Sequence, residues 1–314
     1  MPNPGHRPVK NTDPINEAAP AQDEVAAPQT NRPSLSYYRP PRRRQRAILE
    51  SALVIASPDG SLLEAAPAES AEVLPDAAVA SLGDHSLLEA VLGNDDRVKV
   101  APELLRGNPW RQICALRIRS TSGRTYVGTA WFISPGVLAT AGHCVFLHDD
   151  GGWPTFIDVI PAKFGQEEPF GRVRSTRFAS VDGWTKQRSR DFDYGVIFLE
   201  DATPGTQVGN FEVAALVNAE LGGAVAKVSG YPADRERAEF QFFHERPLID
   251  ITEARLVYDV DTFGGQSGSP IWIDTEELGL IAVGIHTTGG LSSNSGTRIT
   301  DDVLDNLISW VGGQ

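Results

Sequence analysis

Three short motifs, far apart in the chain, carry a histidine, an aspartate and a serine. His143 lies in TAGHC, Asp193 lies in DFDYGVIF, and Ser267 lies in GGQSGSP. A serine hydroxyl is a weak nucleophile until a base accepts its proton, and a third group must hold that base in the correct tautomer. Imidazole titrates near neutral pH and can be that base, and a carboxylate can accept its other N–H. A fold that uses all three must bring these distant segments together.

The residues around Ser267 suit acyl transfer. Its tetrahedral oxyanion is best held by backbone N–H donors that are fixed in advance. Gly265 can adopt a backbone conformation that a residue with a Cβ adopts only at a cost, so we expect the N–H groups of Gly265 and Ser267 to form an oxyanion hole. Each motif alone has an ordinary explanation, such as a Gly-rich loop or an interior histidine. Their order along the chain, each beside a strand-like run, favours catalysis.

The stretches GTAWFISPGVLATAGHC, DYGVIFLE and YDVDTFGGQSGSPIW resemble the trypsin-like (chymotrypsin-fold) serine proteases, and most of all the bacterial glutamyl endopeptidases. The resemblance extends from about Val91 onward. It implies that Ser267 is the nucleophile, His143 the general base and Asp193 the orienting carboxylate. Asp191 is the alternative carboxylate, but Asp193 is preferred because it directly precedes an aromatic and then a small residue.

The resemblance also implies an all-β fold of two six-stranded antiparallel β-barrels, the first over about 109–203 and the second over about 204–299. The sequence independently indicates short strands separated by Gly and Pro. These runs are Ile113–Arg119, Tyr126–Ile133, Val137–Ala139, Ile271–Ile273 and Leu280–Ile285. Apolar residues recur at helical spacing over 300–311, after Thr300 as a suitable N-cap, which predicts a C-terminal helix.

The resemblance implies that the substrate residue before the scissile bond (P1) is Glu, with Asp as a second choice. In glutamyl endopeptidases a histidine, and a threonine five residues before the serine, bind the P1 carboxylate. His286 and Thr262 match these positions, and both can donate hydrogen bonds to a desolvated carboxylate. Asp261 supports the alternative, an acid at the base of a pocket for Lys or Arg. The edge on which an extended substrate pairs is expected from Thr287, Thr288 and Gly289.

Residues 1–89 differ in composition from the rest of the chain. The first 32 residues have almost no large apolar side chains, so they cannot bury enough surface to fold alone. We expect a largely disordered propeptide or regulatory extension at 1–89, followed by the protease domain at 90–314. A cut between Glu89 and Ala90 by the enzyme itself would make the full-length chain a zymogen.

One position departs from the trypsin pattern. Trypsins carry an aspartate directly before the serine, and it pairs with the new N-terminus on activation. Gln266 stands there in this chain and has no charge, so activation through that ion pair is not expected.

Composition and cysteine usage limit the partners. Cys114 and Cys144 are the only cysteines, and the resemblance makes them a candidate disulfide. No apolar run reaches transmembrane length, and the formal net charge of −13 disfavours nucleic acid as a partner despite the basic run at 39–46. No Cys/His cluster predicts a metal site and no Gly-rich loop predicts a nucleotide site, so we expect no cofactor.

No signal segment follows Met1, although the family is mostly secreted, and the cytoplasm or a non-standard export route stays open.

The sequence therefore predicts a serine endopeptidase that acts on protein or peptide substrates, as a monomer. One alternative is an intracellular trypsin-like protease of other P1 specificity that matures a specific partner. The other is a binding module that keeps the fold without the activity.

Overall fold

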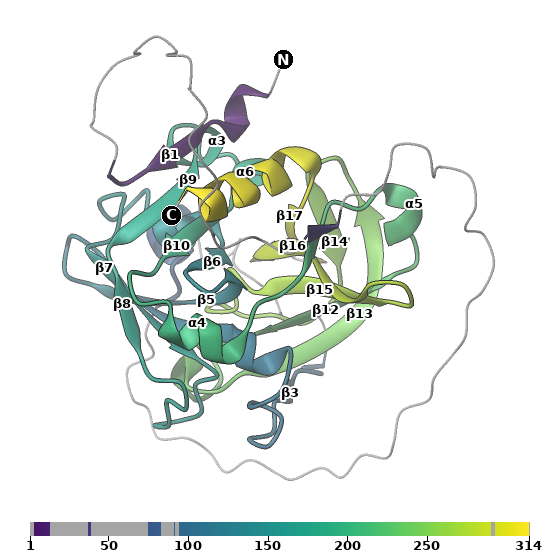
Figure 1. Cartoon of the computed structure of the whole chain (residues 1–314), viewed down its shortest axis with the longest axis horizontal. Helices are drawn as coiled ribbons and strands as arrows, with labels where there is room; N and C mark the ends of the chain where they lie inside the picture. The colour runs from purple at the N-terminus through teal and green to yellow at the C-terminus, as the bar shows by residue number, and fades with distance from the viewer. Residues whose placement is uncertain are drawn as a thin grey trace, which may run out of the picture.

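The computed structural model describes residues 3–12, 37–38, 75–82, 91, 94–289 and 293–313. Eight strands form the first sheet, in the order β1-β9-β10-β6-β5-β4-β7-β8 (Figure 1). Their bounds are β1 (Pro8–Lys10), β4 (Ile113–Arg119), β5 (Thr125–Ser134), β6 (Val137–Thr140), β7 (Phe156–Pro161), β8 (Val173–Ser175), β9 (Arg177–Val181) and β10 (Gly195–Phe198).

The second sheet contains a closed barrel of six antiparallel strands, because β15 pairs with both β12 and β16. The barrel strands are β12 (Val225–Gly230), β13 (Phe242–Ile251), β14 (Arg255–Tyr258), β15 (Pro270–Thr275), β16 (Gly279–Gly289) and β17 (Asn294–Arg298). Three two-residue strands extend this sheet: β2 (Tyr37–Tyr38), β3 (Val98–Lys99) and β11 (Val213–Ala214).

The predicted all-β, two-barrel architecture is confirmed, with one difference in the first half. The first sheet curls into a half-barrel, and in the part of the chain that is described its edge strands β1 and β8 do not pair with each other. The outer edge of β9 is instead occupied by β1, with Val9 opposite Ser180.

The helices are short apart from the last. They are α1 (Val79–Leu82), α2 (Gly142–Val145), α3 (Asp182–Thr185), α4 (Thr203–Val208), α5 (Asn218–Leu221), and the 3-10 helices η1 (Pro4–His6), η3 (Trp110–Gln112), η4 (Arg190–Phe192) and η5 (Glu236–Ala238). The predicted C-terminal helix is confirmed as α6 (Asp301–Gly312). Its N-cap is Thr300, whose side chain accepts the N–H of Val303, and Asp301 and Asp302 in its first turn suit the helix dipole.

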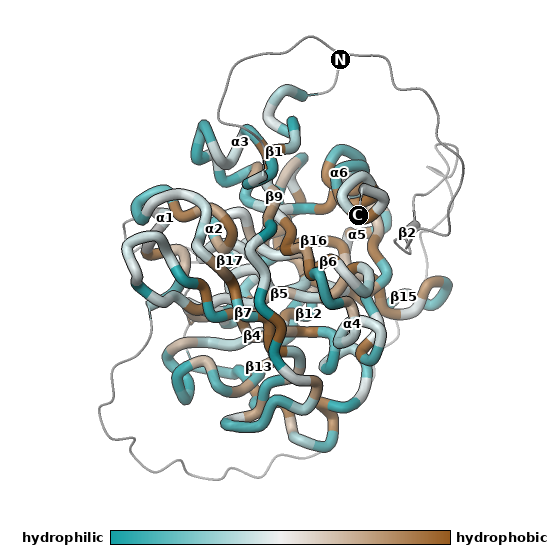
Figure 2. Tube along the Cα trace, turned by 60° about the vertical axis from the view of Figure 1, so that its left-hand side comes forward, coloured by the Kyte–Doolittle hydropathy of each residue, from teal (hydrophilic) through white to brown (hydrophobic). Residues whose placement is uncertain are grey.

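Three large apolar clusters lie in the described part of the chain, beside a small fourth one formed by Val100, Leu105 and Ala162. One lies in the first sheet, one lies in the closed barrel, and a third joins the two halves and α6. In Figure 2 the inner strands are mostly hydrophobic, and most of the outer loops are hydrophilic. Representative members are Leu116, Phe132 and Ile197 in the first cluster, Val228, Leu256 and Ile281 in the second, and Trp131, Trp272, Ile285 and Leu307 in the third. The third cluster fixes how the two halves meet.

Parts of the extension at 1–89 lie against this core. β1 adds to the first sheet, and Asn306 of α6 donates to the carbonyl of His6 at 2.8 Å. Farther along, Ala77 N–H donates to Val127 O and Val127 N–H donates to Pro75 O, both at 3.0 Å. The predicted cut between residues 89 and 90 lies outside the described residues. Among the helices that are described, none has the length and apolar character needed to cross a membrane.

Candidate active site

His143 lies in α2, the single helical turn that follows β6. Its Nδ1 lies 2.8 Å from Asp193 Oδ2, and its backbone N–H donates to Asp193 Oδ1 at 2.9 Å. Both residues are fully buried. Burial alone would lower the pKa of His143, but the Asp193 carboxylate outweighs it and raises this pKa well above its usual range. One carboxylate thus fixes both the ring and the backbone of the histidine.

The structure brings Asp193, and not Asp191, onto the histidine. Asp191 is exposed within η4, whereas Asp193 follows that helix and is fully buried just before β10. Thr297 of β17 donates from its hydroxyl to the Asp193 carbonyl at 3.0 Å. The acid is therefore held between the two halves of the fold.

The loop that carries Ser267 is tied to the first sheet through Thr129 of β5. Thr129 N–H donates to Ser267 O at 2.9 Å, and Thr129 Oγ1 donates to Gly265 O at 2.8 Å. Ser267 is fully buried. These two bonds connect the serine loop to β5 of the first sheet, and β5 pairs with β6, the strand that leads into α2. They therefore fix the position of the serine loop relative to the part of the first sheet that carries His143.

Two backbone carbonyls next to the predicted oxyanion hole point into the protein. Gly264 O accepts from Ala233 N at 2.6 Å, and Gln266 O accepts from Ser269 N at 2.9 Å. In a planar trans peptide the C=O and the following N–H point in opposite directions. The N–H groups of Gly265 and Ser267 are therefore turned away from these interior partners.

The glycines of this loop are required by its backbone. Gly265 has φ +101° and Gly268 has φ +90°, a region that residues with a Cβ rarely adopt. A Cβ at Gly268 would also overlap Thr129 O, and one at Gly265 would overlap Tyr231 O. Each position thus excludes larger residues on two separate grounds.

Of the two predicted P1-binding residues, His286 lies in β16 of the closed barrel and Thr262 lies in the loop between β14 and β15, and both are fully buried. The His286 ring is held by Tyr258, whose hydroxyl lies 2.5 Å from Nδ1. Thr262 Oγ1 has no hydrogen-bond partner among the residues that the structure describes. A buried hydroxyl without a partner costs free energy, so this position favours an incoming polar group.

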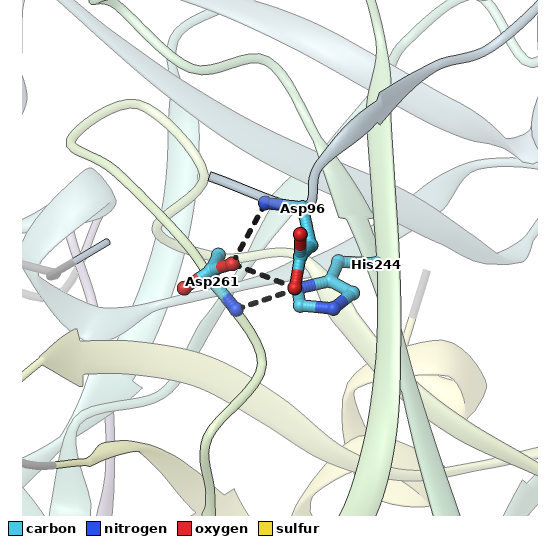
Figure 3. Close-up of side chains that lie close together, drawn as sticks. All are labelled: Asp96, His244 and Asp261. Carbon is cyan, nitrogen blue, oxygen red and sulfur yellow. Dashed lines mark hydrogen bonds and ion pairs between the residues drawn. The ribbon is translucent and has the colours of Figure 1, made fainter. Parts of the chain in front are cut away.

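Asp261 faces interior groups. Its Oδ2 accepts the Asp96 N–H at 3.0 Å and lies 3.4 Å from His244 Nδ1 (Figure 3). This trio is the one group in the described ranges whose spacing could suit a metal ion. The Asp261 N–H donates to His244 Nδ1 at 2.8 Å, however, so the lone pair that a metal would need is already used. Hydrogen bonding accounts for the cluster.

The predicted substrate edge is the end of β16. Thr288 and Gly289 pair with β17 on one side, and no described strand pairs with Thr287–Gly289 on the other. Arg255 lies behind this edge, a residue that the sequence analysis missed. Its Nη2 donates to the hydroxyls of Thr287 at 3.0 Å and Thr288 at 2.7 Å, and Nη1 donates to Arg190 O at 2.7 Å. A lone arginine in a strand gives no local signal for such a contact.

The candidate disulfide is not formed. Cys114 and Cys144 are free and fully buried. Each thiol donates to a different carbonyl, Cys114 Sγ to Gln112 O at 3.8 Å and Cys144 Sγ to Ser267 O at 3.6 Å. Burial raises the pKa of both thiols, which keeps them protonated.

The segment Pro75–Leu82 covers this site, which the sequence did not reveal. Ser81 Oγ lies 3.3 Å from the carbonyl oxygen of His143, and α1 runs beside α2 (Figure 2). A Cβ built on Gly264 would lie 2.9 Å from Asp76 Cβ, so Asp76 packs against the serine loop. The Ala-rich composition of Pro75–Leu82, with Asp76 as its one charged residue, does not indicate that the segment docks here.

Comparisons with known proteins relate the chain to proteases. No protein-family model matches the chain. It is 36% identical over 230 residues to the glutamyl endopeptidase of Bacillus licheniformis, covering 71% of this chain and 69% of that protein. It is 33% identical over 222 residues to a Bacillus subtilis (strain 168) protein named extracellular metalloprotease, covering 70% of this chain and 69% of that protein. A solved Glu endopeptidase structure in complex with MPD superposes with a TM-score of 0.63 at 26% identity, covering 72% of this chain and 100% of that one.

The name of the Bacillus subtilis relative implies a catalytic metal ion, whereas the name of the Bacillus licheniformis relative does not. The contact between His143 and Asp193 and the Gly-rich loop of Ser267 match what a serine protease requires. The one described group with metal-like spacing has its histidine lone pair in use. This chain belongs to the trypsin-like serine proteases of the chymotrypsin fold, in the family of the bacterial glutamyl endopeptidases.

Proposed function

We propose that this chain is a serine endopeptidase that cuts after Glu and is made as a zymogen. Ser267 is the nucleophile, His143 the general base and then acid, and Asp193 the orienting carboxylate. The observation that carries this assignment is the two-point hold of Asp193 on His143, at 2.8 Å and 2.9 Å. It fixes the imidazole with Nδ1 toward the carboxylate, and that leaves Nε2 to serve the serine.

The reaction follows from these positions. Ser267 Oγ attacks the carbonyl carbon of the P1 residue while His143 Nε2 accepts the hydroxyl proton. The oxyanion that forms is held by the N–H groups of Gly265 and Ser267. His143 then gives the proton to the leaving amine, and a water molecule, activated by the same imidazole, releases the acyl group from Ser267.

The simplest test of this assignment is covalent labelling. A fluorophosphonate probe should label the mature protein stoichiometrically at Ser267, and Ser267→Ala should abolish the label. Stoichiometric labelling at another residue, or none in folded mature protein, would contradict the assignment and favour the inactive binding module.

Glu at P1 is supported by the pocket residues. Thr262 Oγ1 is buried without a partner in the described part of the chain, and the His286 ring is held by Tyr258. Both side chains can replace the water that a glutamate loses on entering. The alternative, Lys or Arg at P1, needs a carboxylate facing the substrate, whereas Asp261 accepts the Asp96 N–H and faces His244.

Mapping of cleavage sites tests this preference. The mature enzyme, incubated with a denatured protein mixture, should produce new termini after Glu. Thr262→Val keeps the side-chain shape and removes the hydroxyl, so kcat/KM on a Glu substrate should fall about 10- to 100-fold. The matched Gln substrate should lose less. Cuts after Lys or Arg would contradict the proposal and move the assignment to Asp261.

The zymogen proposal is supported by the cover over the site. Ala77 is fully buried, its N–H donates to Val127 O, and Ser81 lies at the back of the histidine turn. With this segment in place, His143 and Ser267 have no exposed surface, so a protein substrate cannot reach them.

The cover can be tested in a chain that cannot cut itself after residue 89. In Glu89→Gln protein, fluorophosphonate labelling of Ser267 should be slow, and adding Ala77→Arg should speed it at least tenfold by expelling Pro75–Leu82. Gln207→Arg, an exposed change on α4, is the matched control and should have no effect. Equal labelling rates in all three proteins would refute the proposal that Pro75–Leu82 blocks access to Ser267.

A further inference from the structure

The segment Asp95–Arg97 holds the loop Asp261–Ser267 at both of its ends. At one end, the Asp96 N–H donates to Asp261 Oδ2 at 3.0 Å (Figure 3). At the other, Arg97 Nη1 donates to Gln266 Oε1 at 3.4 Å. Gln266 is the position that departs from the trypsin pattern, and the mechanism above gives neither it nor Arg97 a role.

The side chain of Arg97 is fully buried, and its guanidinium has a fixed geometry. Its guanidinium forms a two-point pair with Asp234, Nη1 to Oδ1 at 3.0 Å and Nη2 to Oδ2 at 2.6 Å, and a second pair with Asp95 at 2.7 Å. Burial alone would lower the pKa of Arg97, but the two carboxylates raise it, so the charge is retained. A planar fork held by two carboxylates cannot rotate without losing them, and lysine cannot reproduce it.

Two short paths lead from Arg97 to the peptides of the oxyanion hole. The first runs through Gln266, whose Oε1 also accepts the Phe263 N–H at 3.1 Å, and whose own carbonyl orients the N–H of Ser267. The second runs through Asp234 to its neighbour Ala233. The Ala233 N–H holds the Gly264 carbonyl at 2.6 Å, and that carbonyl orients the Gly265 N–H.

We propose that Arg97 is a positioning residue for the oxyanion hole, acting through Gln266 and through the loop at 233–234. It touches no reacting atom. Its guanidinium supplies the charge that trypsins obtain from a new N-terminus paired with an aspartate. Because Arg97 belongs to the chain itself, the loop at 261–267 is held in place without a new N-terminus. The uncut protein is then kept inactive only by the segment Pro75–Leu82 over the site. This inference rests on the proposed function of Ser267.

The test compares two arginines that bind the same carboxylate. Arg97→Gln removes the buried charge, while Arg235→Gln removes the exposed partner of Asp95 and is the matched control. For the mature enzymes, kcat and KM on a Glu peptide, the inhibition constant of a peptide boronate, and the thermal unfolding temperature are measured. The boronate mimics the tetrahedral state, so it reports on the oxyanion hole, whereas KM reports mainly on ground-state binding.

In Arg97→Gln, kcat should fall about 10²-fold with KM within about twofold, as when one oxyanion donor is lost, and the boronate should bind weaker by a similar factor. Arg235→Gln should stay within about twofold in every constant. An Arg97→Gln enzyme with unchanged kcat, or with kcat lowered but boronate binding intact, would overturn the positioning role.

Two further results keep the test decisive. If Arg97→Gln does not unfold cooperatively, Asp234→Asn decides, because it keeps the side-chain shape and weakens the anchor. It should lower kcat about tenfold with boronate affinity falling in parallel, and unchanged constants would overturn the proposal. Failure of the unaltered mature enzyme to label at Ser267 would instead refute the proposed function, which is a separate result.

Discussion

The choice between the two neighbouring carboxylates can be settled by a pair of matched substitutions. Asp193→Asn keeps one oxygen, which can still accept the backbone N–H of His143, but places an NH₂ group against the ring. Nδ1 must then accept, so the imidazole proton moves to Nε2, where it blocks proton transfer from Ser267. A triad held in the wrong tautomer loses about 10⁴ in kcat, which corresponds to about 5 kcal/mol of transition-state stabilisation. Asp191→Asn alters an exposed side chain and should change kcat less than twofold.

The pH profile gives an independent readout of the same pair. The neutral imidazole is the base, so kcat/KM is lost as the pH falls through the pKa of His143. Asp193 raises this pKa, so the acid limb of the native enzyme should lie above pH 6.5. Removing the carboxylate should shift the limb to lower pH, and Asp191→Asn should leave it in place. The assay is kcat/KM on a chromogenic Glu peptide from pH 5 to 9. A 100-fold loss in Asp191→Asn, or less than tenfold in Asp193→Asn, would refute the reasoning.

Three further outcomes are expected. Gly268→Ala should lower the free energy of unfolding, measured by denaturant titration, by more than about 2 kcal/mol, because the strain of a positive φ adds to the overlap of the new Cβ with backbone atoms. Gly223 also has a positive φ but has open space around it, so Gly223→Ala should cost about 1 kcal/mol. Because Cys114 and Cys144 are free, dithiothreitol should leave the unfolding temperature and kcat unchanged, and a drop in either would reveal a bond. A thiol reagent should react with neither cysteine until the protein is unfolded, and reaction in native protein would contradict their burial.

The parts that the sequence predicted are those with a local pattern. The α6 helix has an N-cap and helical periodicity, and the strand runs have alternation or continuous apolar residues, so each could be located from a few neighbouring residues. The His, Asp and Ser motifs are short and specific as well. The choice of Asp193 over Asp191 agrees with the contact to His143 in the structure.

The parts that were missed depend on contacts between distant segments. Arg97 meets residues 137 and 169 positions away, and no feature of RVKV around it distinguishes a buried arginine from an exposed one. Composition shows that residues 1–32 cannot fold alone, but it does not show that three of them can add to an existing strand edge as β1. The same limit applies to Pro75–Leu82, which has few polar groups of its own and binds through its backbone.

The strand β1 has a consequence for what happens after a cut near residue 89. Pro8–Lys10 bond to β9, and His6 is held by Asn306, on elements separate from the serine loop. A severed front piece would thus remain docked as a second chain, without a covalent link, until it dissociates. Its release would follow mass action, so freshly nicked enzyme should gain activity on dilution and lose it again when concentrated. Hydrolysis of one peptide bond and departure of the fragment are then two separate events, each with its own rate.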